Sequence, residues 1–165
     1  MEHKLRVVDI VEGTTVDGPG LRTAIYFAGC SHRCPGCHNE QTWPFDSGHD
    51  ISVGELMAII DAATFDVTFS GGDPLLQPDI EALTTLARLI RESGRTLWCY
   101  TGFEYEQLAG MQHVQPLLEQ VDVLVDGPYR EALRDIGLRF RGSSNQRLID
   151  LRATRAADHI TLWDE

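Results

Sequence analysis

Three of the chain's four cysteines lie within eight positions, in the stretch GCSHRCPGCHNEQTW. They are Cys30, Cys34 and Cys37, and His32 and His38 stand among them. Thiolate and imidazole are side chains that bind soft and borderline metal ions, and a thiolate can also act in redox chemistry. In a reducing compartment, clustered cysteines indicate such chemistry before they indicate disulfides. The spacing therefore predicts a metal or redox centre.

Two kinds of metal centre fit these side chains. A zinc ion would take three thiolates and either His32 or His38, but structural zinc sites usually draw their ligands in pairs from two separate segments. An iron–sulfur cluster spreads its ligand positions over several irons, which suits thiolates bunched in one loop and leaves one iron open to a substrate. A third interpretation is three buried cysteines without a metal, and the polar residues between them argue against it. The residues favour the cluster.

Composition limits the class of protein. The chain has 165 residues, 42% of them hydrophobic, so we expect a single domain, residues 1–165, with one core. A formal net charge of −11 argues against a phosphate-binding surface. The start MEHKLRVVDIVEG has no targeting pattern, and no later apolar run approaches the roughly 18 residues of a membrane span. We therefore expect a cytoplasmic protein with neither a nucleic-acid nor a membrane partner.

The elements that must position the cysteines alternate between strands and helices. Short β-branched and aromatic runs predict strands, and the nearly all-apolar run VDVLVDG suits a parallel strand covered on both faces. Ser52 begins an amphipathic helix with Glu55 as its capping box, and a second helix ends at Gly94. This order predicts an α/β fold, either an open sheet or a partial barrel. The expected strands are 5–11, 21–29, 66–70, 96–102 and 121–127, and the expected helices are 52–63, 77–94 and one or two within 104–120.

Glycines follow several of the expected strands. Gly29, Gly71, Gly72, Gly102 and Gly127 each stand at or just after a strand end. Open sheets and barrels of the α/β class both place their ligand sites at the carboxyl ends of their strands, and the cysteines share that edge. We therefore expect the metal centre and the glycine loops to face one cavity.

The C-x₃-C-x₂-C spacing of Cys30, Cys34 and Cys37 resembles that of the radical S-adenosylmethionine (SAM) enzymes. The longer stretch VDGPGLRTAIYFAGCSHRCPGCHNEQTW resembles the front half of glycyl-radical-enzyme activases. Four further stretches, FSGGDPL, YTG, VDVLVDGPY and RFRGSSNQRLIDL, resemble the activases of anaerobic ribonucleoside-triphosphate reductase. These stretches cover most of residues 9–151 in the family's order, which argues against chance similarity.

The resemblance implies one radical SAM domain, folded as a partial (β/α) barrel of mostly parallel strands. It implies a [4Fe–4S] cluster held by Cys30, Cys34 and Cys37, with SAM bound to the open iron through its amino and carboxylate groups. The reduced cluster of such enzymes cleaves SAM to methionine and a 5′-deoxyadenosyl radical, which takes a hydrogen atom from a glycine of the reductase. The implied partners are anaerobic ribonucleoside-triphosphate reductase and an electron donor such as flavodoxin or a thioredoxin system.

The resemblance also assigns the glycine loop to the methionine amino group of SAM. This loop is Ser70, Gly71, Gly72 and Asp73, and many radical SAM enzymes have Glu where this chain has Asp73. Two glycines at a strand end let the backbone come close to a ligand. Without the resemblance, the loop would be an ordinary turn from a strand to a helix.

Gly36, Cys37 and His38 are assigned to the neighbourhood of the SAM adenine. The wider superfamily often has an aromatic residue at the position of Gly36, so His38 is the nearest candidate to stack on the adenine, unless it only faces solvent. The resemblance further places Asp126 near SAM. The alternative is that Asp126 merely initiates the turn at Gly127.

The turn VDGPG is assigned to the partner. In the family, the residues equivalent to Asp17, Gly18, Pro19 and Gly20 help to contact the glycine-bearing segment of the reductase, whereas composition alone predicts a plain turn. The polar stretch RGSSNQ, residues 141–146, also matches the family, but the resemblance assigns it no role.

Cys99 stands alone within an expected strand, so we expect a small buried hydrophobe and not a ligand. The remaining histidines have no spacing typical of metal sites, and we expect solvated or capping roles for them. They are His3, His49, His113 and His159.

Two alternatives to the main interpretation stay open. One is activation of another glycyl-radical enzyme such as pyruvate formate-lyase, whose activase shares DGPG and CHN-x₂-TW; the short chain, SGGDPL and RGSSNQ argue against it. The other is a non-catalytic iron–sulfur carrier or a zinc module, neither of which would consume SAM. An iron–sulfur protein is brown and bleaches on reduction, whereas a zinc protein is colourless.

Overall fold

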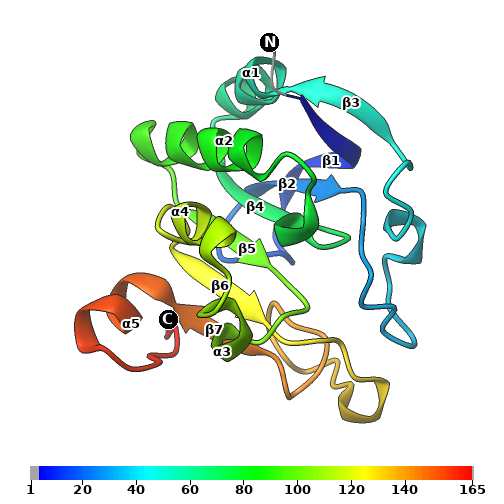
Figure 1. The fold of residues 1–165 in the computed structure, drawn as a ribbon, viewed down its shortest axis with the longest axis vertical. Coiled ribbons are helices and arrows are strands. Elements are labelled where there is room, and N and C mark those ends of the chain that lie inside the picture. The colour runs from blue at the N-terminus through cyan, green and yellow to red at the C-terminus, as the bar shows by residue number, and fades with distance from the viewer. Residues whose placement is uncertain (1–3, 165) are drawn as a thin grey trace.

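A computed structural model of the protein describes residues 4–164, so His3 lies outside the described residues. Within this range the strands form one mixed sheet of seven, in the order β3-β1-β2-β4-β5-β6-β7. Figure 1 shows the sheet crossing the molecule from β3 to β7, with the longer helices α1 and α2 together on one side and long loops on the other. None of the helices in the described part is long and apolar enough to cross a membrane.

The four central strands of the sheet are parallel. Nearly all of their residues are buried, as expected for parallel strands that are covered on both faces. Their carboxyl ends meet at one edge, where the cysteine loop and the glycine loops begin. These strands are β2 (Arg22–Phe27), β4 (Asp66–Gly71), β5 (Leu97–Tyr100) and β6 (Val123–Asp126).

Antiparallel strands flank the parallel ones on both sides. β1 (Lys4–Thr14) pairs with β2 and with β3 (His49–Ser52), and β7 (Arg147–Asp150) pairs with β6. The short turn between β1 and β2 permits only an antiparallel pair, because a parallel pair needs a crossover of a dozen or more residues. The sheet stays open between β3 and β7, so the predicted α/β partial barrel is confirmed, with its parallel pairing confined to the four central strands.

The helices begin and end largely where local signals predict. The Ser52 side chain accepts a hydrogen bond from the Glu55 amide, as the capping box requires, and α1 follows. The second long helix begins at Ile80 and not at 77, because the Asp79 side chain caps it by accepting from the Ala82 amide. The helices are α1 (Val53–Ala63), α2 (Ile80–Glu92), α3 (Tyr105–Leu108), α4 (Gln115–Leu118) and α5 (Leu151–Ala157).

The two faces of the sheet have different neighbours. Alternate residues of the central strands, such as Phe27, Phe69 and Cys99, pack in the main hydrophobic core with α1 and α2. Cys99 is fully buried there, which confirms that it is a small core residue. On the opposite face, Trp98 packs edge-on against Phe140, with ring centroids 5.4 Å apart, in a smaller aromatic cluster. The rest of that face borders a cavity.

Candidate functional site

A cavity of about 680 Å³ lies on the face of the sheet that the long helices do not cover, and it opens at the carboxyl edge of the parallel strands. Its volume is within the range of small-molecule sites. The expectation that the thiols and the glycine loops share a cavity holds for seven of the residues concerned and fails for Gly29. The seven are Cys30, Cys34, Cys37, Gly71, Gly72, Gly102 and Gly127.

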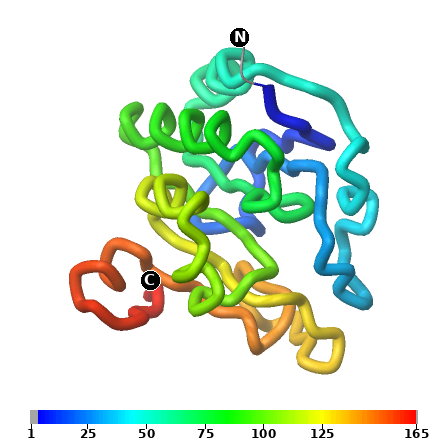
Figure 2. The backbone as a smooth tube through the Cα atoms, in the orientation of Figure 1, coloured from blue at the N-terminus to red at the C-terminus, as the bar shows by residue number. Residues whose placement is uncertain are grey.

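The cysteine loop leaves β2 and is closed at its base by two backbone hydrogen bonds. The Gly29 amide donates to the Thr42 carbonyl at 2.7 Å, and the Cys30 amide donates to the Trp43 carbonyl at 3.0 Å. Figure 2 shows the resulting loop as the blue and cyan segment on the right, apart from the helices. The closure holds a segment with little secondary structure in one place, which is what a preorganised ligand set requires.

All three thiols of the loop are free and half-buried. Burial raises the pKa of the Cys30 thiol to about 11 and also raises the pKa of Cys34, so a metal must displace their protons. The Asn39 amide donates to the Cys37 sulfur at 3.4 Å, and the His32 amide also hydrogen-bonds the Cys30 sulfur. Soft thiolates with amide donors around their sulfurs fit an iron–sulfur cluster.

The zinc alternative finds no support in the described residues. Between residues 4 and 164, no three His, Cys, Asp or Glu side chains form a group that could hold a single metal ion. A cluster does not need such a group, because each thiolate binds a different iron. The described histidines His49, His113 and His159 do not line the cavity.

The glycine loop at the end of β4 rests directly on the base of the cysteine loop. The Gly72 amide donates to the Phe27 carbonyl and the Asp73 amide to the Gly29 carbonyl, both at 2.8 Å. A Cβ atom on Gly72 would lie 2.6 Å from the Gly29 carbonyl oxygen, so the close approach requires glycine. Ser70 lines the cavity beside these glycines. The two loops predicted to bind the cluster and SAM are therefore in backbone contact.

Asp73 is the member of the glycine loop whose side chain is held by other parts of the chain. Its carboxylate is buried, accepts from the Leu75 amide at 3.0 Å and from the Thr101 hydroxyl and the Gly102 amide at 2.9 Å, and lies 2.6 Å from His32 Nε2. Asp73 is absent from the cavity wall that its neighbours line. It therefore joins loops within the protein.

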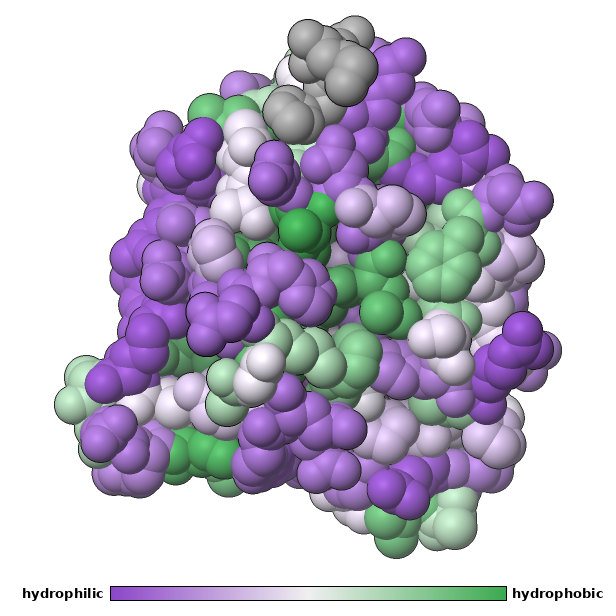
Figure 3. Space-filling model, in the orientation of Figure 1, coloured by the Kyte–Doolittle hydropathy of each residue, from purple (hydrophilic) through white to green (hydrophobic). Residues whose placement is uncertain are grey.

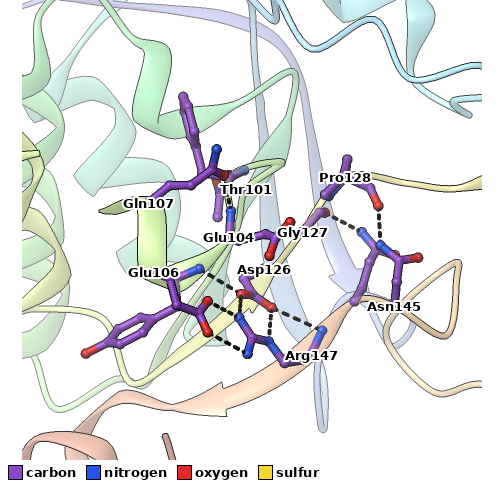
Figure 4. Close-up of polar contacts among 12 residues, drawn as sticks. Thr101, Glu104, Glu106, Gln107, Asp126, Gly127, Pro128, Asn145 and Arg147 are labelled. Carbon is purple, nitrogen blue, oxygen red and sulfur yellow. Dashed lines mark hydrogen bonds and ion pairs between the residues drawn. The ribbon is translucent and has the colours of Figure 1, made fainter. Parts of the chain in front are cut away.

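Asp126 is not among the residues that line the cavity, and Figure 4 shows its carboxylate beside Arg147. Its carboxylate accepts from Arg147 Nε at 3.1 Å and Nη2 at 2.5 Å, and from the Tyr105 amide at 2.8 Å. These bonds, together with the pair that Arg147 makes with Glu106, raise the pKa of the guanidinium. The placement of Asp126 near SAM stays a prediction. In the structure this buried acid has a partner, because β7 provides Arg147 opposite it.

The end of the cysteine loop presents two of its three assigned residues to the cavity. Cys37 and His38 line the wall, whereas a Cβ on Gly36 would collide with Glu131 and come within 3.4 Å of Tyr129. The His38 ring meets the Tyr129 ring edge-on at 5.6 Å. Tyr129, which the sequence interpretation overlooked, is therefore a second aromatic side chain beside the place assigned to adenine.

Further cavity residues come from the inner faces of the strands. Tyr26 and Tyr100 line the wall; the Tyr26 hydroxyl donates to Asp17 at 2.7 Å and the Tyr100 hydroxyl to the Phe140 carbonyl at 2.5 Å. Burial raises the pKa of both phenols, so they are neutral at pH 7. The alternation of the expected strands could have indicated them, because every second residue must face away from the core.

The VDGPG turn is attached to the amino ends of the strands by a buried arginine. Arg22 is 1% exposed, and its Nη1 donates to the Pro19 carbonyl at 3.2 Å. A Cβ on Gly18 would lie 2.7 Å from Arg22 Cδ, so glycine lets the turn close over the guanidinium. Among the four residues assigned to the partner, Asp17 lines the cavity, and Gly18, Pro19 and Gly20 do not.

The RGSSNQ stretch holds the far wall of the cavity together. Gln146 Oε1 accepts from the Gly142 amide at 3.0 Å, and its Nε2 donates to the Gly127 carbonyl at 3.1 Å. Asn145 Nδ2 donates to the Pro128 carbonyl at 2.7 Å, as Figure 4 also shows. The stretch therefore ties the loop after β6 to the start of β7.

Comparison with known proteins identifies the family of the chain. A family model described as "4Fe-4S single cluster domain" matches residues 16–149. The anaerobic ribonucleoside-triphosphate reductase-activating protein of Escherichia coli K12 is 34% identical over 158 residues, which cover 91% of this chain and 98% of that protein. Its namesakes from Vibrio cholerae and phage T4 are each 34% identical, over 87% and 81% of this chain and 94% and 86% of their own lengths. The chain belongs to this family.

The family match and the structural match bear on different parts of the sequence interpretation. A 4Fe–4S domain spanning the three cysteines supports an iron–sulfur cluster over zinc. Among solved structures, the crystal structure of QueE from Escherichia coli matches with a TM-score of 0.51 at 16% identity, over 74% of this chain and 70% of that one. At that identity the match shows the fold alone, and it agrees with the partial barrel described above.

Proposed function

We propose that this protein is a radical SAM activase that generates a glycyl radical on anaerobic ribonucleoside-triphosphate reductase. The observation that carries the proposal is a single cavity with three half-buried thiols on one wall and the Gly71–Gly72 backbone beside them. Cys30, Cys34 and Cys37 would hold the [4Fe–4S] cluster, which when reduced and bound to SAM supplies the electron that cleaves the sulfonium into methionine and a 5′-deoxyadenosyl radical.

The chain's own residues would bind SAM at its two ends. Gly71 and Gly72 present backbone atoms to the cavity, which suits the amino and carboxylate groups of the methionine portion. At the other end, the His38 and Tyr129 rings offer apolar faces to the adenine. Because these groups belong to closed, hydrogen-bonded loops, they would orient SAM without large rearrangement.

The cavity remains open at its mouth, which matters for a reactive product. A radical formed there would be quenched or lost unless a second protein closed the opening and excluded water. The target glycine must also come within about 3 to 3.5 Å of the radical carbon. We infer that the glycine-bearing segment of the reductase enters this mouth and reaches Val16 and Asp17, which line the cavity.

Electron paramagnetic resonance tests the proposal directly. The reduced protein with SAM alone should give slow, uncoupled cleavage to methionine and 5′-deoxyadenosine. Adding the anaerobic reductase under oxygen-free conditions should produce a stable glycyl radical on that partner, and a reductase with its glycine replaced by Ala should produce none. A radical that appears on pyruvate formate-lyase but not on the reductase would support the proposed reaction and overturn the choice of partner.

The rim of the mouth indicates what kind of surface the reductase presents. We call residues 130–142 the rim loop; Figures 1 and 3 place it at the lower edge of the molecule, where the surface shows apolar groups. Its Ile136 is 90% exposed and Leu133 is 42% exposed. The rim loop contains four arginines and two acidic residues in a chain of net charge −11. A partner surface with carboxylates around an apolar pocket would complement it.

Replacing Ile136 by Asp tests this part of the proposal. Burying an isoleucine side chain contributes about 1.5 to 3 kcal/mol, so the variant should bind the reductase roughly 10- to 100-fold more weakly. Its glycyl-radical yield at limiting reductase should fall about tenfold more than its uncoupled SAM cleavage. Leu162→Asp is the matched control, because Leu162 is 59% exposed and does not line the cavity. Equal losses in the two variants would contradict docking at the rim loop.

A further inference from the structure

The cysteine loop carries a histidine whose ring reaches Asp73 of the glycine loop. His32 lies between Cys30 and Cys34, and its Nε2 is 2.6 Å from Asp73 Oδ2. The His32 side chain is 17% exposed and that of Asp73 is 1% exposed, so the pair is largely removed from water. Because a carboxylate can only accept, the Nε2–H of His32 donates to it. Such charge-assisted bonds are stronger than neutral ones.

The surroundings of the His32 ring are shaped to hold it. The ring meets Phe103 edge-on, with centroids 4.6 Å apart. A Cβ on Gly102 would lie 2.5 Å from the ring atom Cδ2, so the backbone after β5 approaches the imidazole as closely as only glycine allows. The histidine is therefore packed between two loops and is not a freely rotating side chain.

Asp73 connects this histidine to a third segment of the chain. The oxygen that faces His32 also accepts from the Thr101 hydroxyl and the Gly102 amide, both at 2.9 Å, and the other oxygen accepts from the Leu75 amide. One buried carboxylate thus receives donors from the cysteine loop and from the segments that follow β4 and β5. A network of this kind specifies one arrangement, because any lost donor leaves a buried charge less satisfied.

We propose that His32 and Asp73 are positioning residues that latch the cysteine loop to the ends of β4 and β5. The latch sets the distance between the cluster on the thiols and the SAM amino-acid end on the Gly71–Gly72 backbone. Asp73 does not line the cavity, and His32, which does line it, has its Nε2 occupied by Asp73. The inference rests on the proposed function, in which electron transfer requires the sulfonium to lie beside the cluster.

The test uses His32→Phe, which keeps the ring packed on Phe103 and removes the donor, and Asp73→Asn, which replaces an acceptor oxygen by an amide. Both variants should keep the iron and sulfide of the wild type after anaerobic reconstitution, because all three thiols remain. The change that SAM induces in the electron paramagnetic resonance spectrum of the reduced cluster should be lost or weakened. The kcat of SAM cleavage should fall about 10- to 100-fold, as for other outer-shell partners of metal ligands, with a smaller change in KM.

Two further measurements distinguish a latch from two independent defects: the activity of the double variant and the recovery of activity in His32→Gln. The double variant should be little worse than Asp73→Asn alone, because that variant already weakens the bond that His32→Phe removes. His32→Gln, which restores an N–H donor, should recover part of the lost kcat, and His49→Phe, which changes an exposed histidine outside the cavity, is the matched control. Additive losses, no rescue by Gln, or a fall in SAM affinity for Asp73→Asn without loss of kcat would each overturn the latch.

Hydrogen exchange on the cluster-free protein provides a readout that does not depend on SAM chemistry. The Gly102 amide donates to Asp73, so its exchange should accelerate in Asp73→Asn and also in His32→Phe if the latch orders this segment. Unchanged exchange in His32→Phe would overturn the latch. A wild-type protein that fails to cleave SAM while this exchange pattern holds would instead overturn the proposed function.

Discussion

Replacing any one of Cys30, Cys34 or Cys37 by Ala should abolish SAM cleavage and remove the brown colour of the anaerobic protein. Each thiolate would hold a different iron, so the remaining two cannot take over its place. Loss of an outer-shell partner of a metal ligand typically costs 10- to 100-fold in affinity or activity, and we expect loss of a ligand itself to cost more than about 100-fold. Iron content, visible absorbance and 5′-deoxyadenosine release measure the effect.

Cys99→Ala is the matched control for these variants. Cys99 is fully buried on the helix-facing side of β5, away from the cavity, so its replacement should leave iron content and SAM cleavage near those of the wild type. Loss of a small buried group should cost about 1 kcal/mol of stability, which thermal unfolding would show. A Cys99 variant without a cluster, together with a Cys30 variant that keeps one and cleaves SAM, would refute the ligand assignment.

Gly72→Val should have the second large effect. The first added atom would lie 2.6 Å from the Gly29 carbonyl oxygen, which is backbone and cannot rotate away. The end of β4 must then separate from the residue that precedes Cys30, so both halves of the site shift. We expect the rate of SAM cleavage to fall at least about tenfold, since a displacement of 1 Å can cost about 100-fold in rate. SAM affinity, measured anaerobically on the reconstituted protein, should fall as well.

Gly54→Ala controls for the effect of adding a Cβ atom elsewhere. Gly54 lies in the first turn of α1, where the nearest atom to an added Cβ is 4.0 Å away. Alanine is favoured over glycine in a helix by about 0.5 to 1 kcal/mol, so this variant should unfold at a slightly higher temperature and bind SAM normally. An unchanged SAM affinity in Gly72→Val would move the amino-acid end of SAM to another part of the cavity.

The sequence by itself determined the features that depend on neighbours along the chain. The cysteine spacing, the Ser52 capping box and the glycines after strands are local signals, and each appears in the structure where the spacing predicts it. The α/β class followed from the order of strands and helices. These signals are reliable because spacing and backbone freedom are set within a few residues.

Elements with weak local signals were not predicted. β3 and β7 have four residues each, and the seven-residue helix α5 follows β7 directly. Short strands at the two ends of a sheet carry little hydrophobic alternation, because only part of each strand is buried. Their pairing with β1 and β6, and not their own propensity, makes them strands.

Only the tertiary structure decided which buried groups are partners. The sequence interpretation placed both Asp73 and Asp126 near SAM. In the structure, Asp73 contacts His32, which is 41 positions away, and Asp126 accepts from Arg147, which is 21 positions away. Sequence shows that a buried carboxylate needs a donor, but not which strand lies beside it or which face its side chain takes. The register of β6 with β7, and the contact of the glycine loop with the cysteine loop, decide those questions, and with them which residues reach the cavity.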